Sequence, residues 1–233
     1  MKSIKTLGIL GGMGPEATSY LFNLIIKNTK VKKDQDHIPV VIFNYPQIPD
    51  RTLNIVENGE SPLLYLIKGM KLLEKAKADV VIIPCNTAHY YIAEINKYSS
   101  LPILNMIELT SKYIKDMPVK KIGVLATTGT VRTKLYQRSL ENLGLEVLLP
   151  TEKEQQDLVM EAVYGKRGVK AGYKKEPKKL LKEISDRLTK RGAEVIIAGC
   201  TEIPLVLDRK DIPVDLVNPM EILAKAAIAY CKG

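Results

Sequence analysis

The chain carries one strand-to-turn motif twice, and this repeat constrains its fold more than any other feature. Residues 80–89 read VVIIPCNTAH, and residues 195–204 read VIIAGCTEIP. Each copy opens with Val and Ile and reaches a cysteine followed by a polar residue. The offset that separates these copies also separates residues 8–15, GILGGMGP, from residues 123–130, GVLATTGT. Two motif pairs in one register predict a duplicated unit.

Each copy has the pattern of a buried strand that ends at a turn. A β-branched run without polar alternation is typical of a parallel strand covered on both faces. Asn86, Thr87 and Thr201 are N-cap residue types, so a helix is expected just after each cysteine. Cys85 and Cys200 would then lie where open α/β sheets bind ligands, and the helix dipole there favours a thiolate. The alternative is a pair of buried structural cysteines, but packing does not require matched thiols at matched strand ends.

Composition narrows the class of protein. A chain of 233 residues has room for one large domain or two small ones, and its 45% hydrophobic and 26% charged residues are ordinary for a globular protein. No apolar run approaches the ~20 residues of a membrane helix. Three cysteines far apart in sequence fit free thiols in a reducing compartment, and the first strand begins near Ile4 without a secretory leader. A cytoplasmic protein with no membrane partner is therefore expected.

The net charge of +9 raises the possibility of nucleic-acid binding. Most lysines, however, alternate with Glu and Asp along predicted helices, a pattern typical of a solvated face. The densest basic stretch, residues 166–179, contains Tyr173 as its one aromatic residue and no RNA-binding signature. No nucleic-acid partner is expected.

Strand and helix signals alternate along the whole chain, which predicts an α/β protein with parallel sheets. The expected strands cover residues 4–10, 40–44, 80–84, 101–105, 121–125, 145–149, 195–199 and 212–218. The expected helices cover residues 15–29, 61–76, 87–98, 107–116 and 131–143, one that opens with the capping box of Thr151 and Glu154, one that ends at Arg191, and one from Met220.

The segment at 212–218 echoes the one at 101–105, which suggests that the chain crosses between two lobes after each cysteine. The expected first lobe is residues 1–101 plus 213–233 and carries Cys85. The expected second lobe is residues 102–212 and carries Cys200. The two cysteines would then lie on opposite walls of an active-site cleft between the lobes.

Six motifs, in order along the chain, resemble the aspartate/glutamate racemase superfamily, and its aspartate racemase branch in particular. They are Ile9–Pro15 (ILGGMGP), Pro46–Thr52 (PQIPDRT), Pro84–His89 (PCNTAH), Leu125–Thr130 (LATTGT), Gly168–Gly172 (GVKAG) and Ala198–Glu202 (AGCTE). The glutamate branch has Asp-Ser after the first strand and His after the second Cys-Thr. This chain has Gly11-Gly12 and Glu202 at those places, which favours the aspartate branch.

The resemblance implies two pseudo-symmetric, Rossmann-like α/β lobes in a homodimer that uses neither pyridoxal phosphate nor a metal. It also implies that Cys85 and Cys200 are the catalytic pair. Racemisation removes a proton from one face of Cα and returns one to the other, so two thiols in opposite protonation states suit the reaction. Without an electron sink, the carbanion needs fixed donors around the substrate carboxylate in a water-poor site.

Several residues are candidates for those contacts with the substrate. Asn86, Thr87, Thr128 and Thr201 lie at strand-end turns, where capping a helix and binding a ligand are compatible roles. Arg51, in the loop after the second strand, offers a guanidinium that can bind a carboxylate through two hydrogen bonds. The resemblance singles out Lys170 as a second carboxylate contact, and two cations would select a dicarboxylic amino acid.

Other residues carry weaker indications. Met13 is a candidate for the mouth of the site or for the core, and Glu202 for orienting Cys200, binding the substrate ammonium or starting a surface helix. His89 suggests a metal, but the second copy has Pro204 at the matching position and no matched ligand. We expect His37 to be a surface residue and Cys231 to pack in the last helix.

The residues lead to one hypothesis and several alternatives. The hypothesis is a racemase that interconverts L- and D-aspartate without a cofactor. A glutamate racemase or one of broader specificity is the nearest alternative. A two-lobed binding protein would make the paired cysteines superfluous. A dinucleotide-binding oxidoreductase fits residues 12–17 (GMGPEA) formally, but the next strand ends in Asn44-Tyr45 rather than in an acidic residue.

Overall fold

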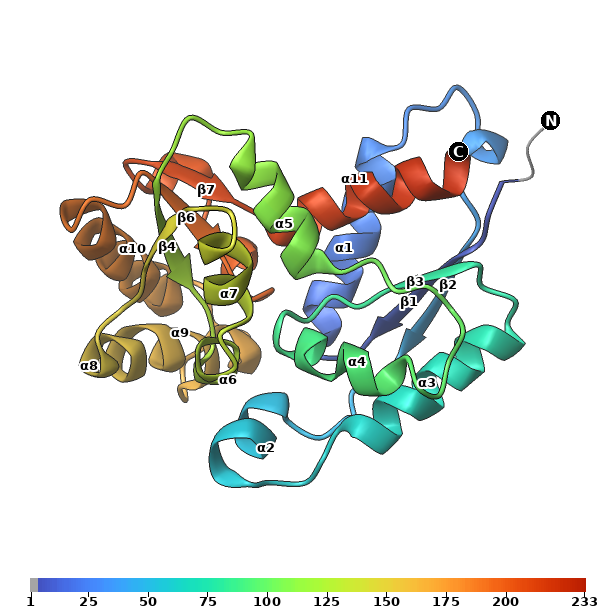
Figure 1. The fold of residues 1–233 in the computed structure, drawn as a ribbon, viewed down its shortest axis with the longest axis horizontal. Coiled ribbons are helices and arrows are strands. Elements are labelled where there is room, and N and C mark those ends of the chain that lie inside the picture. The colour runs from blue at the N-terminus through green and yellow to red at the C-terminus, as the bar shows by residue number, and fades with distance from the viewer. Residues whose placement is uncertain (1–3) are drawn as a thin grey trace. The chain divides into compact units, whose positions relative to one another are not determined.

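A computed structural model describes residues 4–233 and divides the chain into two compact units. The first unit runs to Leu109 and includes Met220–Gly233; the second is Thr110–Pro219. Each unit is a parallel β-sheet with helices packed against it (Figure 1). The predicted α/β class with parallel sheets is confirmed.

The first unit has a three-stranded sheet in the order β2-β1-β3. Its strands are β1 (Leu7–Gly11), β2 (Val40–Asn44) and β3 (Val80–Ile82). Its helices are α1 (Pro15–Asn28), α2 (Arg51–Glu57), α3 (Leu63–Lys75), α4 (Ile92–Ile95) and α11 (Pro219–Lys232), with the short 3₁₀ helices η1 (Asp34–Asp36) and η2 (Thr87–Tyr91).

Alternate side chains of this sheet enter two different cores, as the period of a strand requires. Leu7 and Ile9 of β1 join the core formed with α1 and α11. Leu10 of β1 and Val81 of β3 join the opposite core, formed with α3 and α4. Because both faces are covered, the strands contain no polar alternation, and the unbroken β-branched run before Cys85 is explained.

The second unit has a four-stranded sheet in the order β5-β4-β6-β7. Its strands are β4 (Lys121–Leu125), β5 (Glu146–Leu148), β6 (Val195–Ala198) and β7 (Asp215–Val217). Its helices are α6 (Thr128–Arg132), α7 (Leu135–Glu141), α8 (Glu152–Glu154), the π-helix η3 (Gln155–Met160), α9 (Glu161–Tyr164), α10 (Lys175–Lys190) and the 3₁₀ helices η4 (Val169–Ala171), η5 (Ile203–Leu205) and η6 (Arg209–Asp211). The helix α5 (Met106–Lys115) begins in the first unit and ends in the second.

The two sheets share one topology, which is the structural form of the sequence repeat. In each sheet, the strand that precedes the cysteine pairs in parallel with the strand that opens the unit: β3 with β1, and β6 with β4. On its other side, β6 pairs with β7, and Val81 of β3 forms an isolated parallel bridge with Ile103. Ile103 is therefore the counterpart of β7 in the first sheet.

The unit boundaries lie later in the chain than the sequence predicted. Leu104 donates its N–H to Val81 O at 3.0 Å, so residues 102–104 stay with the first sheet. The strand β7 pairs with β6 in the second sheet, and only α11 joins the first unit. The chain passes from one unit to the other within α5 and at the start of α11. Ile103 and β7 stay with the sheet of the cysteine that precedes them, because each pairs with a strand of that sheet.

Several local predictions need correction. The predicted loop at 45–52 ends before Arg51, because Asp50 accepts hydrogen bonds from the N–H groups of Thr52 and Leu53 and starts α2. The predicted helix at 131–143 is broken at Lys134, which adopts a left-handed conformation with φ of 56°. The predicted capping box of Thr151 and Glu154 is confirmed, with both reciprocal hydrogen bonds present. Within residues 4–233, no helix is both long enough and apolar enough to cross a bilayer.

Candidate active site

The predicted site residues divide between the two units, four with each cysteine. With Cys85, the first unit holds Met13, Arg51, Asn86 and Thr87. With Cys200, the second holds Thr128, Lys170, Thr201 and Glu202.

Cys85 lies just beyond the carboxyl end of β3. Its N–H donates to Ile83 O at 2.8 Å, a tight turn that ends the strand, and its side chain is 6% exposed. The thiol packs in a cluster that includes Met13 and Tyr91. Met13 follows Gly12, whose φ of 93° and approach to the Tyr45 backbone leave no room for a side chain. This glycine lets β1 turn tightly, and Met13 packs in the core rather than on the surface.

Arg51 opens α2, and its guanidinium is buried rather than solvated. The side chain is 6% exposed, and Nη1 donates to Pro49 O at 2.9 Å and to Ile48 O at 3.3 Å. Burial raises the pKa of Tyr91 to about 12; the Arg51 charge lowers it and the Cys85 charge raises it. Both groups therefore lie within electrostatic range of one phenol. These backbone carbonyls hold the Arg51 guanidinium at the start of α2. The helix α2 contacts η2, the 3₁₀ helix that follows Cys85.

Asn86 and Thr87 are buried in the turn after Cys85. The expected N-cap does not form, because Asn86 has helical backbone angles and its side chain makes no capping hydrogen bond. The turn leads into the short 3₁₀ helix η2 and then into α4, rather than into the single α-helix predicted for 87–98.

His89 stabilises this turn through both of its ring nitrogens. Its Nδ1 lies 2.9 Å from Cys85 O, and its Nε2 accepts the Met106 N–H at 3.0 Å. These two partners fix the neutral tautomer with the proton on Nδ1. No group of three or more potential metal-binding side chains occurs in residues 4–233. In this unit His89 supports the backbone of the Cys85 turn.

Cys200 lies at the matching point of the second sheet, where Gly199 separates it from the end of β6, and it contacts a buried carboxylate. Its Sγ donates to Glu202 Oε2 at 3.0 Å, and Thr201 Oγ1 donates to the same oxygen at 3.1 Å. The Lys170 ammonium pairs with the other oxygen, Glu202 Oε1, at 2.8 Å. Glu202 is 4% exposed, so these contacts take place largely out of water.

Burial and the Glu202 charge raise the pKa of the Cys200 thiol well above its ordinary value, and the Lys170 charge opposes them. The expectation that a helix start would favour a thiolate is therefore wrong for Cys200. The helix after it, η5, is a single 3₁₀ turn and contributes little dipole, while the adjacent carboxylate repels a thiolate directly. Cys200 is held as a thiol.

Lys170 comes from η4, inside the basic stretch 166–179. Its ammonium also lies 5.3 Å from the centre of the Tyr164 ring, within cation–π range. No sequence pattern indicates that Lys170 binds Glu202, because the two residues are far apart along the chain. Lys170 was predicted to contact a substrate carboxylate. In the structure its ammonium pairs with the carboxylate of Glu202, which also accepts the hydrogen bond from Cys200.

Two residues that the sequence did not single out belong to this half of the site. Tyr136 is fully buried within electrostatic range of Cys200, and burial raises the pKa of its phenol. Gln155 donates from Nε2 to Ala126 O at 2.9 Å and to Thr128 Oγ1 at 3.3 Å. No local pattern marks either residue, because both reach the site through tertiary contacts.

Comparisons with known proteins agree on one family. The Asp/Glu/hydantoin racemase family model matches residues 10–227. The chain is 31% identical over 229 residues to the broad specificity amino-acid racemase RacX of Bacillus subtilis, covering 96% of each chain. Its fold superposes on an aspartate racemase from Picrophilus torridus with a TM-score of 0.87, at 29% identity over 98% of this chain and 94% of that one. An aspartate racemase homologue from Pyrococcus horikoshii gives a TM-score of 0.78 at 26% identity, over 98% of this chain and 100% of that one.

Proposed function

We propose that this chain, which belongs to the Asp/Glu/hydantoin racemase family, interconverts L- and D-aspartate by proton transfer between two thiols and the substrate Cα. The family makes it an amino-acid racemase, and therefore an isomerase. The observation that carries the proposal is the pair of buried cysteines, each just after the equivalent strand of two equivalent sheets. The proposal places Cys85 and Cys200 on opposite faces of the substrate.

In the proposed reaction, the Cys85 thiolate takes the α-proton from one enantiomer and the Cys200 thiol delivers its own proton to the other face of Cα. The Cα–H bond breaks as a new one forms opposite, so the net change is inversion, and Cys85 ends as the thiol. The opposite enantiomer reacts with the roles exchanged. The hydrogen bond from Cys200 to Glu202 supports the role of Cys200 as the first acid, because it keeps the proton on sulfur.

Lys170 supports the second half of the cycle. Once Cys200 has given up its proton, its thiolate would lie beside Glu202, whose carboxylate repels it. The Lys170 ammonium, 2.8 Å from Glu202 Oε1, offsets that repulsion and lowers the pKa of the thiol. The three groups together let Cys200 hold a proton at rest and still release it during turnover.

Arg51 and Lys170 support a dicarboxylic substrate. Arg51 is a buried guanidinium near the Cys85 turn, and a guanidinium binds a carboxylate through two parallel hydrogen bonds. Lys170 supplies a second cation in the half-site of Cys200. Asn86, Thr87 and Thr128 supply neutral donors that would stabilise the charge that develops on the α-carboxylate, whereas the predicted contact Thr201 donates its hydroxyl proton to Glu202. We propose that no cofactor takes part and that these donors replace the electron sink.

The direct test is exchange of the α-proton in D₂O, followed by chiral analysis of aspartate. Cys85→Ser and Cys200→Ser should each lower racemisation about 10²–10⁴-fold, the usual contribution of a general acid or base. Cys231→Ser is the matched control, because Cys231 is equally buried but lies in α11. If either of the first two variants racemises aspartate at the wild-type rate, the two-thiol mechanism is wrong.

A second assay separates the roles of the two thiols. Loss of HCl from 3-chloroaspartate requires a base for the α-proton but no acid on the opposite face. Cys85→Ser should therefore eliminate HCl from one α-enantiomer only, and Cys200→Ser from the other only. Equal loss on both enantiomers in either variant would contradict the proposed division between the faces.

The alternative substrate range is a broad one, and the similarity to the broad-specificity racemase of Bacillus subtilis supports it. The two substrate ranges predict different effects of replacing Arg51. If the substrate is dicarboxylic, Arg51→Leu should lower kcat/KM for aspartate by about 10²-fold and affect alanine little. Wild-type racemisation of alanine as fast as aspartate would favour the broad range and would leave the thiol mechanism intact.

The family resemblance also supports a homodimer, which light scattering of the purified protein would test. The three cysteines are free thiols, which supports a location in the reducing cytoplasm.

A further inference from the structure

The helix that follows the Thr151 capping box is interrupted by the π-helix η3. Such wide turns occur mostly as short bulges and frequently lie at functional sites. The two ends of η3 meet the same residue: Gln155 Nε2 donates to Thr128 Oγ1 at 3.3 Å, and Met160 Sδ accepts the Thr128 N–H at 3.4 Å. The π-helix therefore contacts Thr128, a predicted substrate contact, from both of its ends.

The Ala126 carbonyl determines which way the Gln155 amide points. Gln155 Nε2 donates to Ala126 O at 2.9 Å, and the reversed amide would set one oxygen against another. The second N–H of the same nitrogen is then directed at Thr128 Oγ1. The Thr128 hydroxyl must accept this hydrogen bond, so its own proton is available to another acceptor. Thr128 is only partly buried, as a side chain that meets a ligand should be.

The oxygen of the Gln155 amide indicates that these hydrogen bonds do not serve mainly to stabilise the fold. Gln155 is 8% exposed, and its Oε1 is buried without a hydrogen-bond partner among residues 4–233. An unsatisfied buried acceptor is unfavourable, and an apolar side chain of similar shape would avoid it. Proteins accept such local conflicts mainly at functional sites.

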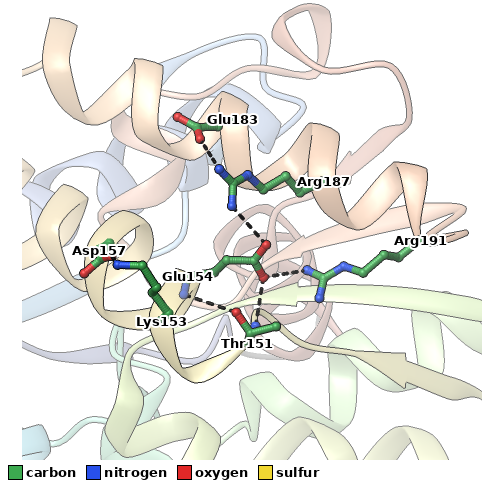
Figure 2. A network of polar contacts seen from close by, with 7 residues as sticks. All are labelled: Thr151, Lys153, Glu154, Asp157, Glu183, Arg187 and Arg191. Atoms are coloured by element: carbon green, nitrogen blue, oxygen red, sulfur yellow. Dashed lines mark hydrogen bonds and ion pairs between the residues drawn. The ribbon is translucent and has the colours of Figure 1, made fainter.

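An ion-pair network holds the residue just before Gln155, as Figure 2 shows. Glu154 pairs with Arg187 at 3.2 Å and with Arg191 at 3.0 Å, both beside or within α10, and accepts the Thr151 N–H at 2.9 Å. Both arginine side chains stay partly exposed to water, so these contacts hold Glu154 as a network of several partners rather than through burial. The network fixes the first turn of the helix, and with it the starting position of the Gln155 side chain.

We propose that Gln155 is a positioning residue that forces the Thr128 hydroxyl to donate its hydrogen bond to a substrate carboxylate. The inference rests on the proposed function for its ligand class, an amino-acid carboxylate. It adds a residue that never touches the substrate but determines the direction of a hydroxyl that does.

The test is a double-mutant cycle on ligand binding. Calorimetry would measure the Kd of L-aspartate and L-glutamate in a background with both Cys85 and Cys200 changed to Ser, so that bound amino acid is not turned over. Gln155→Met and Thr128→Val should each weaken binding about tenfold, the value of one hydrogen bond to a charged group. The double variant should bind no more weakly than Thr128→Val alone.

The matched control is Gln156→Met, the same substitution at the exposed neighbouring position in η3, which should leave Kd unchanged. Gln155→Glu should also weaken binding, because a carboxylate only accepts and would draw the Thr128 proton towards itself. Additive losses, unchanged Kd in Gln155→Met, or no binding of either amino acid by the parent protein would overturn the inference. If the coupling is present but the unmodified enzyme racemises neither amino acid, the proposed function fails and the positioning role stands.

Discussion

The neutral state of His89 predicts a specific loss of stability in mild acid. The imidazole is buried, its Nδ1 lies 2.9 Å from Cys85 O and its Nε2 accepts the Met106 N–H. A second proton would go to Nε2 and oppose the Met106 N–H. Burial accordingly lowers the pKa of His89 to about 4, from an ordinary value of 6.5. Protonation therefore destabilises the folded state at the turn that carries Cys85.

Proton linkage gives the sign and the size of this loss. Between the two pKa values, the unfolded chain binds a proton that the folded chain does not, so stability falls as the pH falls. The contribution is fully present above the unfolded pKa of 6.5 and disappears as the pH approaches the folded value of about 4. A shift of that size corresponds to about 3 kcal/mol, of which about 2.5 kcal/mol is lost by about pH 4.5.

Urea unfolding followed by far-UV circular dichroism, at about pH 7 and about pH 4.5, would measure the loss. Other groups also titrate in this range, so the informative quantity is a difference between variants. Between the two pH values, the wild type should lose about 2.5 kcal/mol more than His89→Gln, which has no imidazole to protonate. His37→Gln, which changes the only other histidine, should behave as the wild type. Equal losses in the wild type and His89→Gln would refute the reasoning.

Two further predictions concern the Cys200 half-site and the first turn. In a protein whose other cysteines are serine, Glu202→Gln should shift the midpoint pH for alkylation of Cys200 by iodoacetamide to a lower value. The substitution removes the charge that raises the pKa of the thiol and leaves Lys170 to lower it. An unchanged or higher midpoint pH would contradict that cause. Gly12→Ala should destabilise the protein by at least about 2 kcal/mol in urea unfolding, because its Cβ would lie 2.3 Å from the Tyr45 backbone at a positive φ. Gly144→Ala, at a positive φ with open space around it, should lower the free energy of unfolding by less than Gly12→Ala does. Equal losses in the two variants would mean that backbone strain alone is responsible.

The fold class and the places of the two cysteines could be predicted from the amino-acid sequence. Unbroken β-branched runs are typical of strands covered on both faces, and a strand that ends in a tight turn presents the next residue at the edge of its sheet. Because the motif occurs twice in one register, the two sheets could be predicted to match, as β3 and β6 do. The capping box at Thr151 was equally predictable, since its two hydrogen bonds join residues three positions apart.

The chemistry around those cysteines depends instead on tertiary contacts. Burial and the charge of Glu202, whose side chain turns back to the sulfur, raise the pKa of Cys200, and Lys170 from a distant turn opposes them only in part, so local helix-dipole reasoning predicted the wrong sign. The hydrogen bonds of Arg51, the tautomer of His89 and the direction of the Gln155 amide likewise depend on carbonyl and N–H groups brought close by folding. Periodicity indicates which residues are buried, but hydrogen-bond partners and electric fields act through space, and the folded chain alone specifies them.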